Sequence, residues 1–438
     1  MHFKRIILLM VIIITINSCV KVDDSVCPAC PTITNIIPGS ASFDDTIQLI
    51  GNHLLPDLTK GDSLQLKINN VPIPASYILK NTATSITLIV PKAIGSGKVS
   101  VDINVKDGLV NHGDVNFTYN PKWIVSTLAG TGNHGYADNS DPLSAMFKTI
   151  VDITVDPSNN DLYVLESDKV RKISFNGGVS TVMTFTPTTE SAIACGRDDG
   201  IFLTYKPNNC KISMIDHSMG VNTFLDYAGQ AGNCVDVSNV PIANAGFSNL
   251  NDIVIDFNMN KYVADGNSLK LITNTNVYKI AGSTTGYSDG DYKTAQFSEI
   301  KSIDVDPKNG DIYIADFLNH RIRKLSGNTV FTVAGIGYPT FINGPVATAS
   351  LSYPNGLACD IARNIYFTEG GHYAIRKIDL NNGVVSTFAG MHHDAGSMNG
   401  DAMMARFNNP TKLAFNRALN TLYIVDSSNY KIRQMKFE

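Results

Sequence analysis

The side chains of this 438-residue chain that could bind a ligand are aromatic, histidine and small polar residues in a few glycine-rich segments. One such segment reads G-Y-S-D-G at 286–290, and another carries adjacent histidines at 392–393. An aromatic ring can stack on the C–H face of a sugar while Asn, Asp and His side chains bind its hydroxyl groups. The candidates for carbohydrate binding are His134, Tyr136, Asp138, Tyr287, Asp289, Tyr338, Phe341, Asn343, His320, His372, Tyr373, His392 and His393.

Each candidate also has a plainer structural explanation. Gly and Asn accept a positive φ, so sequences such as G-Y-S-D-G and N-G form turns whether or not they bind anything. The accumulation of such residues therefore favours a binding site more than any single member does.

The histidines raise the alternative of a metal centre. Adjacent His392 and His393 point in different directions unless their loop is sharply bent, and the other histidines occupy different positions of the repeat described below. Zinc needs three converging ligands and an open position, and no such set can be assembled from the sequence. The chain also lacks G-x-S-x-G, H-E-x-x-H and a phosphate-binding loop. We therefore expect no catalytic residues and no cofactor; zinc or calcium would belong to an alternative enzymatic function.

The candidate segments recur because residues 121–438 contain about six copies of one motif. The clearest copy, at 277–335, contains V-Y-K-I-A-G, G-Y-S-D-G, I-D-V-D-P, I-Y-I-A-D and N-H-R-I-R-K-L. Its Ala-Gly pair recurs at Gly130, Gly229, Gly282, Gly335 and Gly390. A period of about fifty residues with four short β-rich runs predicts a six-bladed β-propeller.

Alignment of the copies with one another gives columns of equivalent residues. Two acidic columns follow the first and second strands, for example Asp306 and Asp316, and a basic column in the third strand includes Arg323. The second copy has lost the charge in all three columns, which predicts ion pairs inside each copy rather than a functional ring. Cys195 and Cys359 fall in an apolar column, so we expect buried thiols.

The ends of the repeat region predict how the propeller closes. The last copy stops after its third strand, and residues 123–129 match the fourth strand of the other copies. That segment should pair with the last blade and protect its edge. The loops that join successive blades and the turns between second and third strands should share one face. The chain should enter the propeller at the opposite face. If the N-terminal part of the chain is anchored to a membrane, as described below, the candidate-rich face should point away from that membrane.

Residues 31–120 have a different sequence pattern. Short runs in which apolar and polar residues alternate, such as T-I-Q-L-I-G and S-I-T-L-I-V-P, are separated by Gly, Asn and Pro. This spacing favours an immunoglobulin-like sandwich. The segments P-T-I-T-N-I-I-P-G at 31–39 and V-N-F-T-Y at 115–119 resemble the IPT/TIG family of sandwiches. That resemblance implies a spacer or binding module, and we expect a stalk.

The propeller region resembles the NHL family, whose motif matches I-Y-I-A-D-F-L-N-H-R-I-R-K at 312–324. Some relatives of NHL propellers are lyases or lactonases that hold zinc or calcium at the channel mouth. The resemblance therefore implies both the fold and an enzymatic alternative.

The N-terminus predicts export. Lys4 and Arg5 precede an apolar run that ends at I-N-S-C, which resembles a bacterial lipobox. That resemblance makes 1–18 a signal peptide, Cys19 the lipidated residue and 19–30 a linker, with plain secretion as the alternative. The sequence K-V-D-D at 21–24 looks like a surface-export tag. Outside the cytoplasm, Cys27 and Cys30 could pair or stay reduced, and a disulfide between Cys210 and Cys234 is an open alternative.

Composition sets the broad class. A hydrophobic content of 43% excludes a disordered chain, and a formal charge of −4 gives no reason to expect nucleic acid. The design resembles the accessory glycan-binding lipoproteins of Gram-negative polysaccharide-uptake systems. This resemblance implies a non-catalytic, monomeric carbohydrate binder on the outer membrane that serves an uptake transporter or a secreted glycoside hydrolase. The alternatives are a metal-dependent lyase or lactonase and a protein-docking platform or adhesin.

Overall fold

The computed structural model describes residues 31–438 except 43–44, 55–64, 70, 91–96, 106–108, 186–188, 198–199, 207–209, 217–221 and 231–233. The predictions for the signal peptide, Cys19, Cys27 and Cys30 lie outside these residues. The chain divides into two compact units, Met1–Pro121 and Lys122–Glu438. Among the described residues, no helix is both long enough and apolar enough to cross a membrane.

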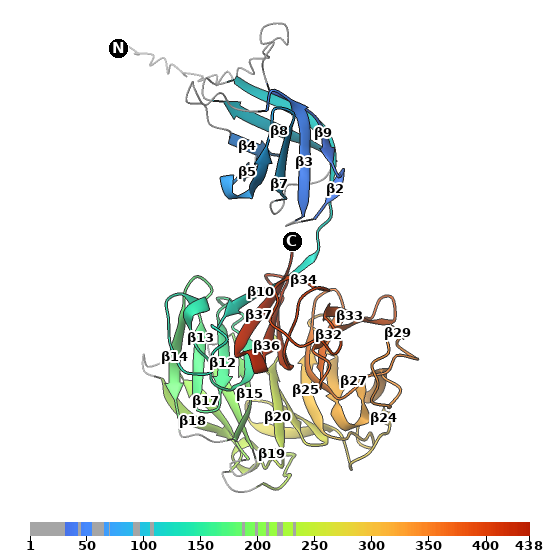
Figure 1. Cartoon of the computed structure of the whole chain (residues 1–438). Coiled ribbons are helices and arrows are strands. Elements are labelled where there is room, and N and C mark those ends of the chain that lie inside the picture. The colour runs from blue at the N-terminus through green and yellow to red at the C-terminus, as the bar shows by residue number, and fades with distance from the viewer. Residues whose placement is uncertain are drawn as a thin grey trace, which may run out of the picture. The chain divides into compact units, whose positions relative to one another are not determined.

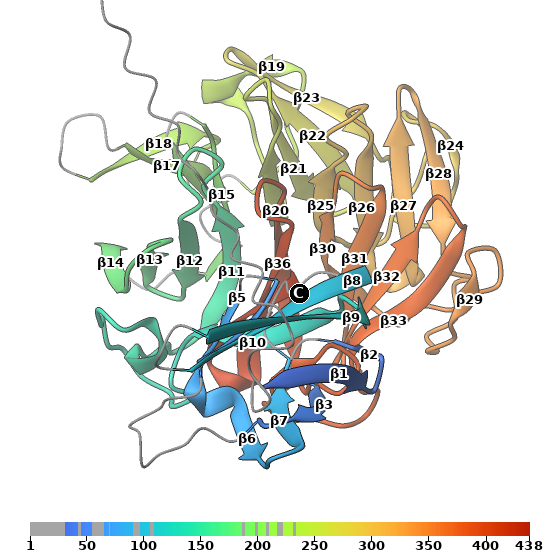
Figure 2. The same ribbon diagram turned by 90° about the horizontal axis from the view of Figure 1, so that it is seen from above.

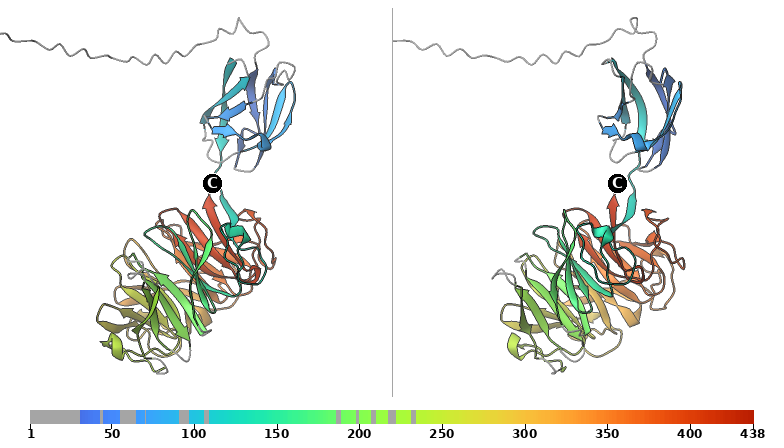
Figure 3. Two further views of the ribbon diagram at one scale, coloured as in Figure 1. Left: turned by 90° about the vertical axis from the view of Figure 1, so that its left-hand side faces the viewer. Right: turned by 60° about the vertical axis from the view of Figure 1, so that its left-hand side comes forward.

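The first unit is a sandwich of two β-sheets, as predicted. One sheet has the order β1 (Thr32–Ile37), β3 (Thr46–Asn52), β7 (Ser85–Ile89) and β6 (Ile78–Asn81). The other has the order β2 (Ser40–Ala41), β9 (Leu109–Tyr119), β8 (Gly97–Val105), β4 (Gln65–Ile68) and β5 (Val71–Ile73). Alternate residues of each strand point inward, so Leu49, Leu88 and Val101 join one buried core between the layers (Figure 3).

The second unit is a six-bladed β-propeller, which confirms the predicted fold class (Figure 1). Its first three blades are β11–β14 (Ile150–Val155, Leu162–Glu166, Lys169–Ile173, Val179–Thr184), β15–β18 (Thr189–Cys195, Ile201–Lys206, Ile212–Asp216, Thr223–Ala228) and β20–β23 (Leu250–Ile255, Lys261–Asp265, Ser268–Ile272, Asn276–Ala281). Blades 4 and 5 are β25–β28 (Ile300–Val305, Ile312–Asp316, Arg321–Ser326, Thr329–Ala334) and β30–β33 (Pro354–Cys359, Asn364–Glu369, Ala374–Asp379, Val384–Gly390). Blade 6 consists of β35 (Pro410–Asn416), β36 (Thr421–Asp426), β37 (Lys431–Phe437) and β10 (Trp123–Ala129).

Short outer strands extend four of the blades: β19 (Val240–Pro241), β24 (Gly290–Asp291), β29 (Gly344–Pro345) and β34 (Gly400–Asp401). The inner strands β11, β15, β20, β25, β30 and β35 contact one another in ring order, and β35 returns to β11. Figure 2 shows strands of blade 1 running from β14 at the outside to β11 near the centre. The propeller is therefore closed around a central channel.

The predicted ring closure is confirmed. Strand β10 pairs antiparallel with β37, with Trp123 opposite Phe437. Lys122 and Glu438 extend the ladder by two backbone hydrogen bonds. The two ends of the repeat region thus complete blade 6 together and give its third strand a partner.

The cysteines follow two patterns. Cys195 and Cys359 are buried in the inner strands, as predicted from their apolar column. Cys210 and Cys234 are joined by a disulfide, which resolves the alternative that the sequence left open.

Buried ion pairs inside the blades are also confirmed. In blade 4, Arg323 Nη1 lies 2.8 Å from Asp316 Oδ2, and both side chains are fully buried. In blade 5, Arg376 Nη1 lies 2.9 Å from Glu369 Oε1. The same pair occurs in the remaining charged blades as Glu166–Arg171, Asp265–Lys270 and Asp426–Arg433.

The prediction was wrong for the acidic column that follows the inner strand. Asp306 and Asp360 do not join the cation; they accept hydrogen bonds from the hydroxyl groups of Tyr313 at 3.3 Å and Tyr366 at 3.0 Å. Asp306 also accepts from the backbone N–H of Lys308, and Asp360 accepts from both the backbone N–H and the side-chain amide of Asn364. These carboxylates stabilise the turn after the inner strand instead of pairing with the cation. A short acidic side chain readily accepts hydrogen bonds from the backbone N–H groups of the residues that follow it.

Removing one member of a buried pair should be strongly destabilising. We expect Arg323→Met to lower the free energy of unfolding by about 3–5 kcal/mol, because it leaves Asp316 as a buried, uncompensated charge. Urea unfolding followed by fluorescence of Trp123, the single tryptophan, measures this within the propeller.

The matched control is Lys324→Met, which removes a partly exposed partner of Asp311. We expect it to cost at most about 1 kcal/mol. Equal effects of the two substitutions would contradict the account of a buried pair.

Candidate functional site

The loops that join successive blades and the turns between second and third strands share one face, here called the loop face. The His134 ring, in the loop after β10, lies 5.2 Å from the ring of Tyr430, in the turn after β36. Phe341, in the loop after β28, lies 5.2 Å from His372, in the turn after β31. These contacts agree with the face predicted from the strand order.

The buried cations hold the loops of this face. Arg323 Nη2 donates to the carbonyl oxygen of Ser288 at 2.8 Å, and its Nε donates to Asp289 at 2.9 Å. Arg376 Nη2 donates to the carbonyl oxygen of Ile342 at 2.7 Å and to Asn343 Oδ1 at 3.0 Å. Each guanidinium therefore ties its own blade to the loop that leads into it.

Three of the polar candidates bind these buried cations and so help to hold the loops. Asp138 pairs with Arg171 at 2.7 Å, Asp289 with Arg323, and Asn343 with Arg376. Their side chains also bond the outer strand, as when Asp138 accepts from the backbone N–H of Thr181 at 2.9 Å. These residues shape the loops through these bonds, and they stay exposed to solvent beside the neighbouring rings.

The tyrosine candidates differ in how much of each side chain is exposed to solvent. The Tyr136 hydroxyl donates to Asp168, and partial burial raises the pKa of Tyr136 to about 12. Tyr287 is 45% exposed, although the Arg321 guanidinium lies 3.8 Å from its ring centroid. Tyr338 is 70% exposed, the largest value among the exposed large hydrophobic and aromatic residues that the structure describes.

Two further candidates lie apart from the exposed rings. His320 is buried, and its Nδ1 accepts from the backbone N–H of Tyr353 at 3.3 Å. Burial, with the nearby charge of Arg321, lowers the pKa of His320. His134 contacts Tyr430 at the junction of blades 6 and 1. Neither residue joins the group described next.

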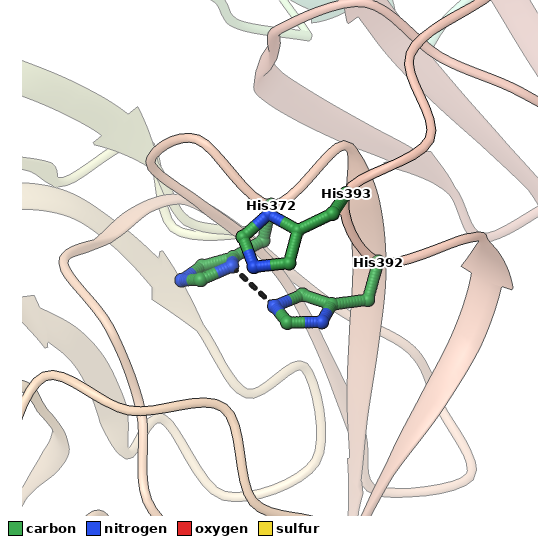
Figure 4. A group of neighbouring side chains, drawn as sticks. All are labelled: His372, His392 and His393. Carbon is green, nitrogen blue, oxygen red and sulfur yellow. Dashed lines mark hydrogen bonds between the residues drawn. The ribbon is translucent and has the colours of Figure 1, made fainter.

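The structure does bring together Phe341, His372, His392 and His393, here called the histidine cluster. His392 Nε2 lies 2.7 Å from His372 Nδ1, and Figure 4 shows the three imidazoles gathered around this bond. One ring nitrogen from each histidine lies within 4.8 Å of the others. Phe341 stacks on His392 with a centroid distance of 4.2 Å. Tyr373 is next to His372 in the same turn and is half-buried.

Local backbone geometry explains this convergence. His393 has φ +62°, in the left-handed region, which supplies the sharp bend that adjacent histidines need to face one partner. A Cβ at Gly390 would lie 2.6 Å from the carbonyl oxygen of Tyr373, so only glycine lets the two loops approach so closely. Three histidines thus converge in a set that could not be assembled from the sequence, because the required loop bend is present.

Two histidines of the cluster have a lowered pKa. Burial, together with the other two histidines and Arg376, lowers the pKa of His372 to about 4. The pKa of His392 is also lowered, first by burial. At neutral pH the rings of His372 and His392 are therefore uncharged, each with one N–H and one nitrogen lone pair.

A second polar site, which was not predicted from the sequence, lies in the central channel. A cavity of about 260 Å³ is lined by all six inner strands, with Asp152, Asp252, Ser302 and Lys412 on its wall. Lys412 Nζ lies 3.6 Å from Asp252 Oδ1, and Ser302 donates to Asp252 Oδ2 at 2.7 Å. The channel thus holds two carboxylates and one ammonium group, all nearly buried.

One column of equivalent residues in the repeat could have indicated this channel site. The equivalent positions of the six copies are Asp152, Ala192, Asp252, Ser302, Gly356 and Lys412. This column changes character from copy to copy, whereas the position that follows it is Ile or Leu in every copy, which marks the column as lying outside the repeated core. Beyond it the channel reaches the turns after the inner strands, where Arg417 pairs with Asp304 at 3.0 Å.

The channel predicts a pH effect on stability. Burial raises the pKa of Asp152 to about 7 from its ordinary 3.8; nearby Lys412 opposes this shift and Asp252 adds to it. The stabilising contribution of protonated Asp152 is therefore present below pH 4 and lost as the pH rises through about 7. Asp152→Asn keeps the side-chain shape but cannot titrate, so its stability relative to the parent should rise by about 2–3 kcal/mol between pH 5 and pH 8. Urea unfolding at both pH values measures this, and a difference that does not change with pH would contradict it.

Comparison with known proteins agrees with this architecture. Residues 31–119 match the IPT/TIG domain family, so the sandwich is an IPT/TIG domain. An auxiliary nutrient binding protein from Bacteroides ovatus superposes with a TM-score of 0.69 at 17% identity, covering 93% of this chain and 98% of that one. An auxiliary nutrient binding protein from Bacteroides thetaiotaomicron gives 0.63 at 20% identity, with the same coverages. These structures share the fold.

Curated relatives match only parts of the chain. SUPPRESSOR OF QUENCHING 1 of Arabidopsis thaliana is 42% identical over 77 residues, which is 17% of this chain and 7% of that protein. Teneurin-3 of Mus musculus is 32% identical over 145 residues, which is 28% of this chain and 5% of that protein. The chain thus spans less than a tenth of the length of either relative.

Proposed function

We propose that this protein is a non-catalytic surface lipoprotein, with a propeller of NHL type, that binds carbohydrate on its loop face as an accessory to nutrient uptake. The observation that carries this proposal is the pair of exposed aromatic rings on the loops that lead into blades 4 and 5, Tyr287 and Tyr338, with the half-buried ring of Phe341 beside them. Flat rings with one open face are the surfaces on which sugar C–H groups stack.

The three rings belong to one continuous surface. Arg321 covers one side of Tyr287, and its Nη2 donates to the carbonyl oxygen of Ile336 at 3.1 Å. Ile336 begins the loop that carries both Tyr338 and Phe341. The Arg321 side chain therefore connects the first ring to the loop that bears the other two.

This surface is held in place before any ligand arrives. Arg376 binds the loop at Ile342 and Asn343, and its guanidinium lies 4.4 Å from the Phe341 ring centroid. Tyr287 is fixed by its hydroxyl contact with Thr332 at 3.1 Å. A preorganised surface loses little conformational freedom on binding, which favours recognition of a flexible polysaccharide.

Two structures of the same fold carry the name auxiliary nutrient binding protein, which supports an accessory nutrient-binding role here. Carbohydrate as the nutrient is our inference from the aromatic surface. An outer-membrane uptake transporter or a secreted glycoside hydrolase would be the partner that receives the ligand.

Binding is tested with the full chain in detergent, by calorimetry against a panel of plant, algal and host polysaccharides. We expect saturable binding that Tyr287→Ala and Tyr338→Ala each weaken by roughly 10-fold, which corresponds to ~1.4 kcal/mol per aromatic contact.

The control is Tyr278→Ala, which removes a 40% exposed ring from the outer strand β23, away from the loop face. Affinity should stay at the parent value in this variant. No saturable binding across the panel, or an equal loss in the control, would contradict a carbohydrate site on the loop face.

The location is also a proposal. The basic and apolar start of the chain, with Cys19 at the end of a lipobox-like sequence, supports acylation and anchoring in the outer membrane. The acidic residues at 23–24 support exposure to the cell exterior. Several acyl chains would give a stable anchor, since a single chain binds membranes only weakly.

Cys19→Ala should move the protein from the membrane fraction to the soluble fraction of the cell or to the medium. The parent, expressed in intact cells, should be digested by added protease. Retention of the variant in the membrane fraction would contradict anchoring through Cys19, and a protease-resistant parent would contradict exposure at the cell surface.

A further inference from the structure

The stacking of sugars on aromatic rings does not account for the convergence of three imidazoles beside Phe341. His372 comes from the turn between β31 and β32, whereas His392 and His393 come from the loop that leaves β33 for blade 6. Gly390 lets these two segments touch, and the left-handed backbone at His393 turns its ring toward the same point as that of His392 (Figure 4).

The hydrogen bonds of the cluster leave most of its nitrogens available. Six ring nitrogens are present, and the contact between His392 Nε2 and His372 Nδ1 is the one hydrogen bond that they make within the described part of the chain. His392 and His393 are exposed and His372 is half-buried. Each neutral imidazole offers one lone pair, so an ion bound by all three rings would replace only the contact between His392 and His372.

Nearby charges do not block a cation. The guanidinium of Arg376 lies 4.4 Å from the Phe341 ring centroid, and its charge is balanced by Glu369 at 2.9 Å. Asp394, which follows His393, is turned away to Arg406, whose Nε lies 2.6 Å from Asp394 Oδ2. The group that faces the common point is therefore made of imidazole nitrogens alone.

The ligand chemistry selects the class of metal. Imidazole nitrogen suits zinc, copper and nickel, whereas calcium and magnesium require oxygen ligands. Zinc–nitrogen bonds measure about 2.0–2.1 Å, so nitrogens within 4.8 Å of one another need only small side-chain rotations to share one ion. Stacking of Phe341 on His392 limits the orientations of that ring and favours a preformed site.

We propose that His372, His392 and His393 form a site for one zinc-class divalent metal ion on the loop face, with a fourth coordination position open to solvent. The ion would link the turn of blade 5 to the loop that leads into blade 6. This site is independent of the carbohydrate proposal, because its ligands are protein side chains and its formation needs no sugar.

Zinc binding is tested by calorimetry on the purified full chain after removal of metals with a chelator. We expect one zinc ion per chain, and we expect His372→Ala, His392→Ala and His393→Ala each to weaken binding by at least about 10-fold. Titration with calcium or magnesium should give no saturable binding.

The matched control is His134→Ala, which removes a histidine of the same face whose ring contacts Tyr430 instead of the cluster. It should bind zinc with the parent affinity. Undiminished binding in the triple variant His372→Ala, His392→Ala, His393→Ala, or no zinc binding by the parent, would overturn the proposal.

A second readout does not depend on calorimetry. Cobalt should bind the parent and give the intense visible absorption of a four-coordinate site, and the triple variant should lack it. Zinc should also raise the Tm of the parent but not that of the triple variant, because a ligand that binds only the folded state stabilises it. Neither measurement contains saccharide, so failure here would leave the carbohydrate proposal standing, and the reverse also holds.

Discussion

The geometry of the loop face depends on one interaction, the buried cation in the third strand of a blade. Its charge is matched by a carboxylate of the neighbouring second strand, at 2.7–2.9 Å in five blades. Its remaining donors reach out to carbonyl oxygens and an Asp or Asn of the loop leading into the blade, as with Met398 and Asn399 on Arg433. A buried charge without these partners would cost several kcal/mol, so the loop is fixed wherever the cation is present.

Blade 2 supports this interpretation because it has lost both the cation and the loop. Ser213 stands where the other blades have Arg or Lys, and only residues 185–188 separate β14 from β15. The loops leading into blades 4 and 5 run over 282–299 and 335–353. Where no long loop has to be held, no buried cation is needed. The change in blade 2 is thus explained by packing, without a functional gap in the ring.

Much of the fold could be predicted because a repeated sequence supplies its own alignment. Columns of equivalent residues predicted the six blades, the closure through 123–129 and the pairs such as Glu369–Arg376. They failed in two kinds of place, where a side chain binds its local turn and where different copies meet in the channel. Asp306 and Asp360 bind local turns, and Asp152 and Lys412 meet only because the ring brings distant copies together.

The candidate site was predicted less completely. The aromatic and polar candidates were chosen by residue type. Residue type alone does not show that Asp289 forms an ion pair with Arg323, whereas Tyr338 faces solvent. The meeting of His392 and His393 with His372 depends on one left-handed residue and on the close approach at Gly390. Such backbone details are set by tertiary contacts, so a list of residue types cannot show them.

The central claim is that ligands bind the loop face rather than the opposite mouth of the channel. Hydrogen–deuterium exchange of the full chain, with and without the polysaccharide that binds most tightly, tests it directly. The account predicts protection in 286–291, 335–344 and 370–373. Protection confined to 157–160 and 256–258, at the turns after the inner strands, would contradict it.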